Sequence, residues 1–281
     1  MRILVIGGRG MAGHLLLQYL TGTASYELFH TTRETTRPNR IGGLYLDALD
    51  SPAVEKLVEA VRPDVIVNCA GILNDAARRH ELDAYRINGL LPHLLAGLAE
   101  RVGGRLIHIS TDCVFSGCRG KYEERHVPDG TSVYAKTKAL GEIFAKPHVT
   151  IRTSIIGPEI RSHGIGLLHW FMQQQGVIKG FLQVPWNGVT TLELAKFIHY
   201  LLGTGSPVTG LVHLTAAETV SKHELLHKFR RIFGKTDVDI QPDDAIVLDR
   251  TLRSTRTDIT GYTQAGYDAM LAELRDWMRA E

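Results

Sequence analysis

Short runs of apolar residues alternate with helical patterns along the first 155 residues of the chain. The runs are continuous and do not alternate with polar residues, which is typical of parallel strands buried on both faces of a sheet. They lie at residues 3–6, 28–29, 44–46, 65–67, 106–109 and 149–151. Helical patterns follow at 11–20, within 79–102 and around 132–146. Another helix is expected to begin at Ser51, which would cap it, with Pro52 in its first turn. The alternation predicts an α/β fold with a doubly wound parallel sheet and helices on both faces.

The pattern changes after residue 155, where Gly157 and Pro158 interrupt it. Further helices are expected at 167–175, 190–202, 221–233 and 265–279, and short strands near 182–184 and 211–214. The third of these helices starts with a capping box formed by Ser221 and Glu224. We therefore expect a first domain over residues 1–157 and a smaller α/β lobe over 158–281, with elements that can interleave with the first domain.

Composition excludes several classes of function. The 281 residues are 44% hydrophobic and carry a formal net charge of +2, which gives no electrostatic argument for nucleic acid or an anionic membrane. No run approaches the roughly 20 apolar residues of a membrane helix, and the start of the chain lacks a signal-peptide pattern. Cys69, Cys113 and Cys118 are odd in number and lack metal-ligand spacing. We expect a cytoplasmic protein with no metal site.

A glycine-rich turn, Gly7-x-x-Gly10-x-x-Gly13, directly follows the first apolar run and opens the first helix. In such a turn the first glycine permits the bend, the second lets the backbone approach a pyrophosphate, and the third allows close packing of helix on strand. Amide groups at the helix start then bind the phosphates. The turn predicts a Rossmann-type dinucleotide-binding domain over 1–157, with cofactor contacts from Gly7, Arg9, Gly10, Met11 and Gly13.

The end of the second run distinguishes the two dinucleotides. An NAD site usually has an acidic residue there for the ribose diol. This chain instead has Thr32 and Arg33, which suit a 2′-phosphate, and Arg9 could add a second cation. NADP(H) is therefore favoured, with NAD(H) as the alternative, although a solvated basic loop explains the same residues.

Tyr134 and Lys138 are one helical turn apart, so they share a helix face. A nearby ammonium stabilises a phenolate, so we expect Lys138 to bring the Tyr134 pKa down from its usual value near ~10. Thr111, or Ser110 beside it, ends the fifth strand and would donate a second hydrogen bond to a carbonyl oxygen. Lys138 would also bind the nicotinamide ribose. These residues predict hydride transfer between a carbonyl and an alcohol.

With these motifs the chain resembles the extended short-chain dehydrogenase/reductases, most of all the dTDP-4-dehydrorhamnose reductase group, which reduces 4-keto sugars on nucleotides. The resemblance covers most of residues 1–157 and is looser in the lobe. It rests on the glycine turn and on residues 64–71, 87–88, 110–117, 134–142, 152–154 and 190–196. It implies NADP(H)-dependent reduction of a 4-keto-6-deoxy sugar nucleotide in activated deoxysugar or polysaccharide biosynthesis.

The resemblance also implies further contacts. For the cofactor these are Asp47 and Ala48 at the adenine, Cys69, Ala70 and Gly71 beside the fourth strand, Asn88 behind the site, Ser110, and Ser154 and Ile155 near the nicotinamide. For the substrate they are Asn74, Thr111, Asp112, Cys113, Trp170, Trp186, Asn187 and Arg253. Bland alternatives remain for several of them: Asp47 can cap a turn, Asn88 can satisfy backbone groups, and tryptophans more often pack than bind.

Two other functions and an assembly are considered. Dehydratases of this superfamily have a glutamate where this chain has Cys113, so dehydration is not expected. Cys113 with His163 or His169 could form an epimerase pair, as in the GDP-fucose synthases. A non-catalytic NADP-binding regulatory subunit is the other alternative. A homodimer is expected through helices 79–102 and 132–146, although an ordinary core-facing stripe also explains the leucines there. Those leucines are Leu90, Leu91, Leu94, Leu95 and Leu98.

Overall fold

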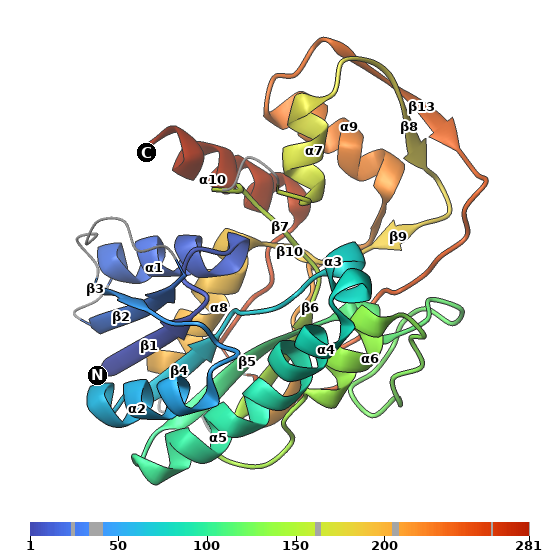
Figure 1. Cartoon of the computed structure of the whole chain (residues 1–281). Coiled ribbons are helices and arrows are strands. Elements are labelled where there is room, and N and C mark those ends of the chain that lie inside the picture. The colour runs from blue at the N-terminus through green and yellow to red at the C-terminus, as the bar shows by residue number, and fades with distance from the viewer. Residues whose placement is uncertain (24–25, 34–41, 161–163, 204–207, 260, 281) are drawn as a thin grey trace.

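A seven-stranded parallel sheet forms the centre of the computed structural model, which describes residues 1–23, 26–33, 42–160, 164–203, 208–259 and 261–280 (Figure 1). The strand order is β11-β6-β5-β4-β1-β2-β3. The strands are β1 (Arg2–Ile6), β2 (Glu27–Thr32), β3 (Gly42–Tyr45), β4 (Val65–Asn68), β5 (Arg105–Thr111), β6 (Val149–Thr153) and β11 (Gly210–His213). Because the chain starts in the middle and winds outward in both directions, the predicted doubly wound sheet is confirmed.

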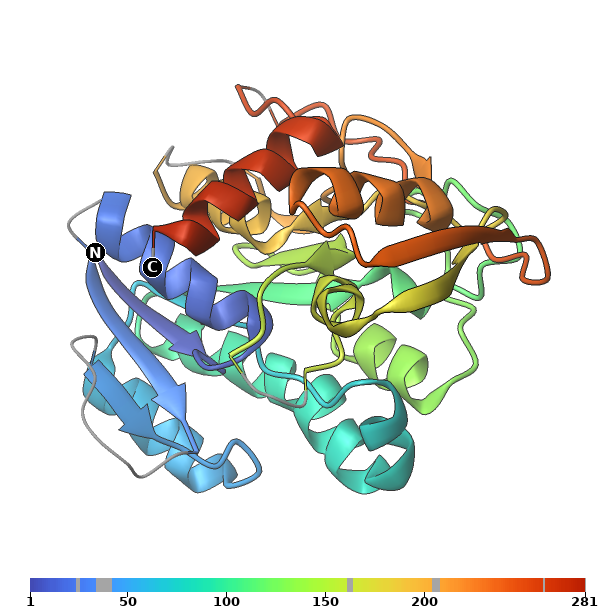
Figure 2. The ribbon, with the colours of Figure 1, turned by 90° about the horizontal axis from the view of Figure 1, so that it is seen from above.

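Helices cover both faces of this sheet (Figures 1 and 2). On one face lie α1 (Met11–Thr23) and α8 (Thr191–Gly203), and on the other α2 (Ser51–Val61), α5 (Leu91–Arg101) and α6 (Val133–Leu140). Along β1, Ile3 and Val5 join the hydrophobic cluster under α1 and α8, while Leu4 and Ile6 join the one under α2 and α5. A strand with a core on each side must be apolar throughout, which explains the continuous runs.

The C-terminal lobe lies beyond the carboxyl ends of the strands and extends across the top of Figure 1, from α10 at the left to β8 and β13 at the right. Three two-stranded ladders link its parts: β8 with β13, β9 with β12, and β7 with β10. Its elements are β7 (Ile155–Ile156), α7 (Leu167–Gln173), β8 (Gly176–Phe181), β9 (Pro185–Trp186), β10 (Val189–Thr190), β12 (Val220–Ser221), α9 (Lys222–Ile232), β13 (Val238–Asp243) and α10 (Tyr267–Arg279). The lobe is thus an α/β unit, whereas β11 and α8 return to the central sheet. The division at residue 157 stays a prediction.

Three local predictions are wrong. The strand expected at 182–184 is a turn, and the strand lies at β8 instead. The cap of α2 is Asp50, whose Oδ1 accepts a hydrogen bond from the Ala53 amide at 3.0 Å. The helix expected over 132–146 ends at Leu140. Gly141 follows it at a site where a Cβ would lie 2.0 Å from the Asn88 carbonyl oxygen, so the chain here is fixed by packing against its neighbour.

The helical stretch expected over 79–102 is broken into several pieces. These are α3 (Asn74–Arg79), α4 (Glu81–Ala84), the π-helical η1 (Tyr85–Leu90) and α5. Of its leucine stripe, Leu91, Leu95 and Leu98 are buried in the core, whereas Leu90 is 58% exposed. The stripe is thus mostly core, and the homodimer stays a prediction. Within the described ranges, no helix combines the length and apolar character needed to cross a bilayer.

A buried ion pair links two neighbouring strands to the helix that follows β5. Arg152 of β6 meets Glu142, just after α6, through two hydrogen bonds: Nε to Oε1 at 2.7 Å and Nη2 to Oε2 at 2.6 Å. Both side chains are excluded from solvent, and Ser110 of β5 donates its hydroxyl to the same Oε1 at 2.7 Å. Such a bidentate geometry fixes both partners in orientation as well as in distance. The pair therefore ties together β5, β6 and the end of α6.

We predict that Arg152→Met strongly destabilises the fold, because it leaves the Glu142 carboxylate buried without its partner. Loss of one member of a buried pair costs about 3–5 kcal/mol of unfolding free energy, which urea denaturation would measure. The control is Arg101→Met, which removes an arginine that pairs with Glu55 and Glu59 on the surface. Equal urea midpoints for the two variants would contradict this role of the pair.

Candidate active site

The glycine-rich turn has the geometry that a dinucleotide phosphate requires. Gly7 has a φ of +80°, and a Cβ there would lie 3.0 Å from the Ala70 backbone. A Cβ on Gly13 would lie 2.4 Å from the Gly7 carbonyl oxygen, so helix α1 packs on the turn only with glycine at this position. A Cβ on Gly10 would meet only that same oxygen, at 3.4 Å. The Gly10 side of the turn is thus open, which fits close approach of a phosphate to the backbone at the start of α1.

Gly8 is a further constraint that the spacing of the motif did not indicate. A Cβ at Gly8 would lie 2.7 Å from the ring of His30 on β2. The amides of Gly7 and Gly8 donate hydrogen bonds to the side-chain and backbone oxygens of Thr31, at 3.0 and 3.2 Å. Strand β2 therefore fixes the position of the turn through these contacts.

A cavity of about 390 Å³ opens at the carboxyl ends of the strands, between the turn and the C-terminal lobe. It brings together residues that the sequence places more than 200 positions apart. The predicted residues that line it are Arg9, Gly10, Met11, Cys69, Ala70, Gly71, Asn74, Ser110, Thr111, Asp112, Cys113, Tyr134, Lys138, Ser154, Ile155 and Trp186. The location agrees with the rule that ligands of doubly wound sheets bind beyond the strand ends.

Other predicted cofactor residues lie outside this lining. Gly7 and Gly13 belong to the turn itself, Thr32 ends β2, and Arg33 directly follows it and is exposed. The remaining three are Asp47, Ala48 and Asn88.

Two of these make contacts within the protein. Asp47 accepts a hydrogen bond from the Leu49 amide at 3.1 Å, which forms a turn. Asn88 is fully buried and binds both the amide and the carbonyl of Ile72 at 2.8 Å. Its amide also donates to Thr137 of α6, so Asn88 fixes the loop after β4 against the helix that carries Tyr134.

Three predicted substrate residues do not reach the cavity lining. Trp170 lies on α7 with 38% of its surface exposed. Asn187 uses its side-chain amide and carbonyl to bind the backbone of Leu252, at 2.7 and 3.1 Å, so its role here is structural. Arg253 is exposed and lies 3.7 Å from Glu123.

The neighbouring Arg250 reaches further toward the site than Arg253. It donates from Nε to the Phe115 carbonyl at 2.8 Å, and its Nη1 lies 3.8 Å from the Cys113 sulfur. Spacing alone could not distinguish the two arginines, because loop geometry decides which one faces the site.

The three predicted catalytic side chains lie around one end of the cavity. Thr111 ends β5, accepts a hydrogen bond from the Cys113 amide and donates one to the Asp112 carboxylate, both at 3.1 Å. Lys138 donates from Nζ to the Ile109 carbonyl at 2.6 Å. Tyr134 is the second residue of α6, whose start is capped by the Ser132 hydroxyl. The strand end and the helix start thus face the same space.

The predicted lowering of the Tyr134 pKa is wrong in this structure. Burial raises the pKa of the phenol, and interactions with Cys113 and Asp112 add to the rise, while the hydroxyl of Thr111 opposes it. Burial lowers the pKa of Lys138 to about 8, against the opposing influence of Glu142 and Cys69. Desolvation is thus the largest influence on both groups.

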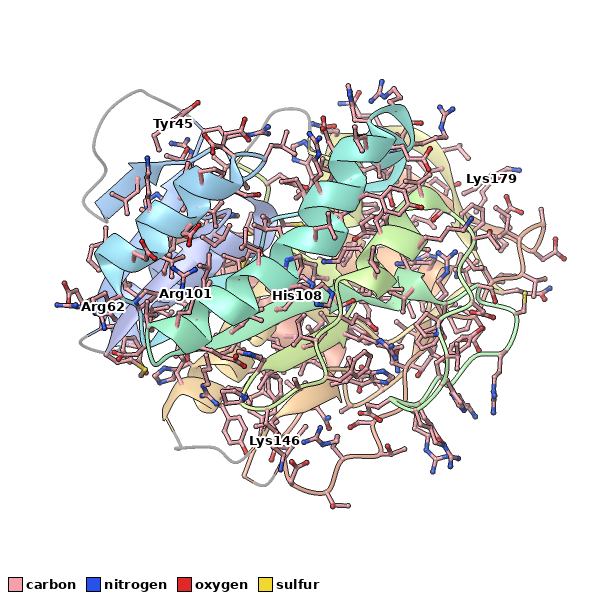
Figure 3. All side chains as sticks on the ribbon, turned by 60° about the horizontal axis from the view of Figure 1, so that its bottom comes forward. Tyr45, Arg62, Arg101, His108, Lys146 and Lys179 are labelled. Carbon is pink, nitrogen blue, oxygen red and sulfur yellow. The ribbon has the colours of Figure 1, made fainter. Side chains whose placement is uncertain are left out.

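Sequence reasoning missed His108 of β5, which contacts Lys138 and lies on the face of the sheet covered by α5 and α6 (Figure 3). Its Nε2 lies 3.4 Å from the Lys138 ammonium, and its Nδ1 lies 3.2 Å from the Asn68 amide nitrogen. Burial and the Lys138 charge keep its pKa well below the usual value, so it is neutral. A lone histidine inside an apolar strand was the only signal.

Sequence reasoning also missed Lys222, the first residue of α9, which lines the cavity from the lobe. Its ammonium lies 4.5 Å from the centroid of a Trp186 ring. Burial lowers its pKa to about 8, while Asp112 and Cys113 favour the charged form. A lysine after a capping serine is ordinary in sequence, so only the tertiary fold reveals it.

The epimerase pair is not supported by the histidine that can be placed. His169 lies on α7, and its Nε2 is 2.9 Å from the Gln173 side chain. His163 lies outside the described residues. Burial also raises the pKa of the Cys113 thiol to about 12, so the thiolate that a base requires is not formed near neutral pH. Among the described residues, no group of three or more potential ligands could hold a metal ion.

Comparison with known proteins agrees with this geometry. The model of the RmlD substrate binding domain family matches residues 1–246. A dTDP-4-dehydrorhamnose reductase of Streptomyces griseus is 36% identical over 293 aligned residues, covering 99% of this chain and 91% of that protein. A probable dTDP-4,6-dihydroxy-2-methyloxan-3-one 4-ketoreductase of Streptomyces antibioticus is 28% identical, covering 100% of this chain and 93% of that protein.

The fold also matches a solved structure. The dTDP-4-dehydrorhamnose reductase of Bacillus anthracis, in complex with NADP, superposes with a TM-score of 0.81 at 22% identity. The match covers 97% of this chain and 98% of that one. It supports the expectation of a Rossmann-type fold, which the parallel sheet and glycine turn show independently.

We predict that Gly13→Ala lowers both stability and dinucleotide affinity. The added methyl group would overlap the Gly7 carbonyl oxygen, and overpacking of this kind costs about 1–3 kcal/mol. Gly22→Ala is the matched control, because Gly22 lies in the same helix with nothing within 4 Å of a Cβ. Urea unfolding and NADPH fluorescence titration would measure both effects. Wild-type affinity in Gly13→Ala would refute the packing role of Gly13.

We also predict that the thiols differ in reactivity. Burial raises the pKa of both Cys69 and Cys113 to about 12, so only a very small fraction of either is the reactive thiolate near neutral pH. At pH 8 iodoacetamide should therefore modify the exposed Cys118 first, with the other two at least about tenfold slower. Peptide mass spectrometry would give the three rates. Fast labelling of Cys113 would show a thiolate and revive the epimerase hypothesis.

Proposed function

The chain belongs to the RmlD substrate binding domain family, and we propose that it catalyses NADP(H)-dependent reduction of a 4-keto-6-deoxy sugar nucleotide. The observation that carries this proposal is the convergence of the glycine turn, Thr111, Tyr134 and Lys138 on one cavity. The names of the two Streptomyces relatives support a dTDP-linked keto sugar as the substrate. The product would serve activated deoxysugar and polysaccharide biosynthesis.

NADP(H) is the proposed cofactor, with NAD(H) as the alternative. When bound, it supplies the hydride for the carbonyl carbon. The amides at the start of α1, with Gly10 in the open part of the turn, would hold its pyrophosphate. Arg9 lines the cavity and Arg33 directly follows β2, and guanidinium groups suit a 2′-phosphate.

The hydroxyl groups of Tyr134 and Thr111 are the proposed donors to the substrate oxygen. Because burial keeps the Tyr134 phenol protonated, it is in the state that can give a proton to an alkoxide. Thr111 would exchange its bond with Asp112 for one with the carbonyl oxygen. Lys138, held at the Ile109 carbonyl, keeps further N–H donors for the ribose and for the phenol oxygen.

Neither of the two alternative functions, a regulatory subunit and an epimerase, gains support from the site. A non-catalytic, NADP-binding subunit does not need the tyrosine and lysine pair, which this chain keeps in the cavity. Epimerisation would need a base, and the neutral Cys113 thiol is unsuited to that role.

We predict that Tyr134→Phe retains NADPH binding but lowers turnover by about 10²–10⁴-fold, the usual effect of a general acid. NADPH oxidation would be followed by absorbance with dTDP-4-keto-6-deoxy-D-glucose as substrate. Tyr26→Phe is the control, since it removes a hydroxyl that contacts His199, away from the cavity. Turnover of Tyr134→Phe within a few fold of wild type would exclude Tyr134 as the acid, and an inactive wild type that binds NADPH would favour a regulatory subunit.

A further inference from the structure

Trp186 was predicted to be a wall of the substrate pocket, yet the indole has little surface left for a ligand. It stacks on Tyr267 at a centroid distance of 5.5 Å, and its Nε1 donates to the Ser154 hydroxyl at 2.8 Å. The side chain of Lys222 extends over it, and Trp186 is only 4% exposed. Trp186 therefore acts as a platform, and the group that it presents to the cavity is the Lys222 ammonium.

The backbone around Lys222 is fixed by hydrogen bonds to neighbouring elements. The β12 strand just before it pairs antiparallel with β9, which contains Trp186. The Lys222 amide donates to the Val184 carbonyl at 3.0 Å. Ser221 and Glu224 form the capping box that fixes the start of α9. Rigid support of this kind is what a residue needs if it is to orient a ligand.

The N–H donors of the Lys222 ammonium can bind a ligand. In the described part of the chain it forms no ion pair and no side-chain hydrogen bond, and its contact with the indole face uses none of its three N–H donors. It lines the same cavity as Asp112 and Cys113, both of which are near enough to favour its charged form. Asp112 in turn is bonded to Thr111, one of the two hydroxyl groups proposed to hold the carbonyl oxygen.

This arrangement places a donor and an acceptor on different lobes, next to the point of reaction. Lys222 can only donate, and the Asp112 carboxylate can only accept. A hexose with adjacent hydroxyl groups can use both kinds of partner, whereas the oxygens of a diphosphate can only accept and would leave Asp112 without a donor. The pairing therefore favours the sugar over the nucleotide as the ligand of Lys222.

We propose that Lys222 is a specificity-determining residue that donates hydrogen bonds to sugar hydroxyl groups beside the keto carbon and so orients the carbonyl toward Tyr134 and Thr111. This inference rests on the proposed function. Lys222 would thus make the contact with the substrate that was predicted for the buried Trp186. The nucleotide and the cofactor would be bound without its help.

The test compares Lys222→Met with Lys222→Arg and with the control Lys228→Met. Lys228 lies on the same helix but pairs with Asp268 outside the cavity. Loss of a charged hydrogen bond should raise the KM for dTDP-4-keto-6-deoxy-D-glucose by about 10- to 100-fold in Lys222→Met. The Kd for NADPH and the inhibition constant of dTDP should stay within about twofold of wild type. Lys222→Arg should recover part of the loss, and Lys228→Met should resemble wild type.

Each other result overturns the proposal in a recognisable way. An unchanged KM in Lys222→Met would show that the ammonium does not bind the sugar. A parallel rise in the dTDP inhibition constant would place Lys222 at the nucleotide, and weaker NADPH binding would indicate damage to the lobe. If the wild-type protein reduces no nucleotide-linked keto sugar, the proposed function itself fails, and this inference fails with it.

Discussion

The buried pair of Glu142 and Arg152 is the constraint on which the arrangement of the site depends. It joins β6 to the segment after α6 and receives the hydroxyl of Ser110 from β5. The tyrosine and lysine of α6 can face Thr111 only if that helix and that strand end keep their relative position. Because the pair is dry and bidentate, small displacements would break strong bonds. The site is thus positioned by charges that take no part in the chemistry.

Desolvation dominates the electrostatics of the cavity. The phenol of Tyr134 is kept protonated and the pKa of Lys138 and Lys222 is brought down to about 8, although opposite charges are near. A hydroxyl that stays protonated suits the delivery of a proton during reduction. Lysines whose pKa is about 8 remain mostly charged at neutral pH, so they still attract oxygen atoms of ligands. The lobe thus supplies a cation of its own, Lys222, to the cavity.

Much of the fold and part of the site could be predicted because local rules determine them. Continuous apolar runs locate the strands, and the 7-10-13 glycine spacing gives the turn whose packing the structure shows. Predictions failed where tertiary contacts decide. Helix α6 ends at Leu140, where Gly141 packs on η1, and β11 joins the central sheet although its sequence lies inside the lobe. The role of Lys222 could not be predicted, because its position in the cavity depends on packing against Trp186, which lies 36 positions earlier in the chain.

The central claim is that NADPH bound in this cavity transfers a hydride to the keto carbon of a nucleotide sugar. The most direct measurement is a single turnover with NADPH deuterated at the transferring position and dTDP-4-keto-6-deoxy-D-glucose, followed by NMR of the sugar. The account predicts one deuterium at C4 for each NADPH oxidised. Unconsumed NADPH, or a product that lacks deuterium at C4, would contradict it.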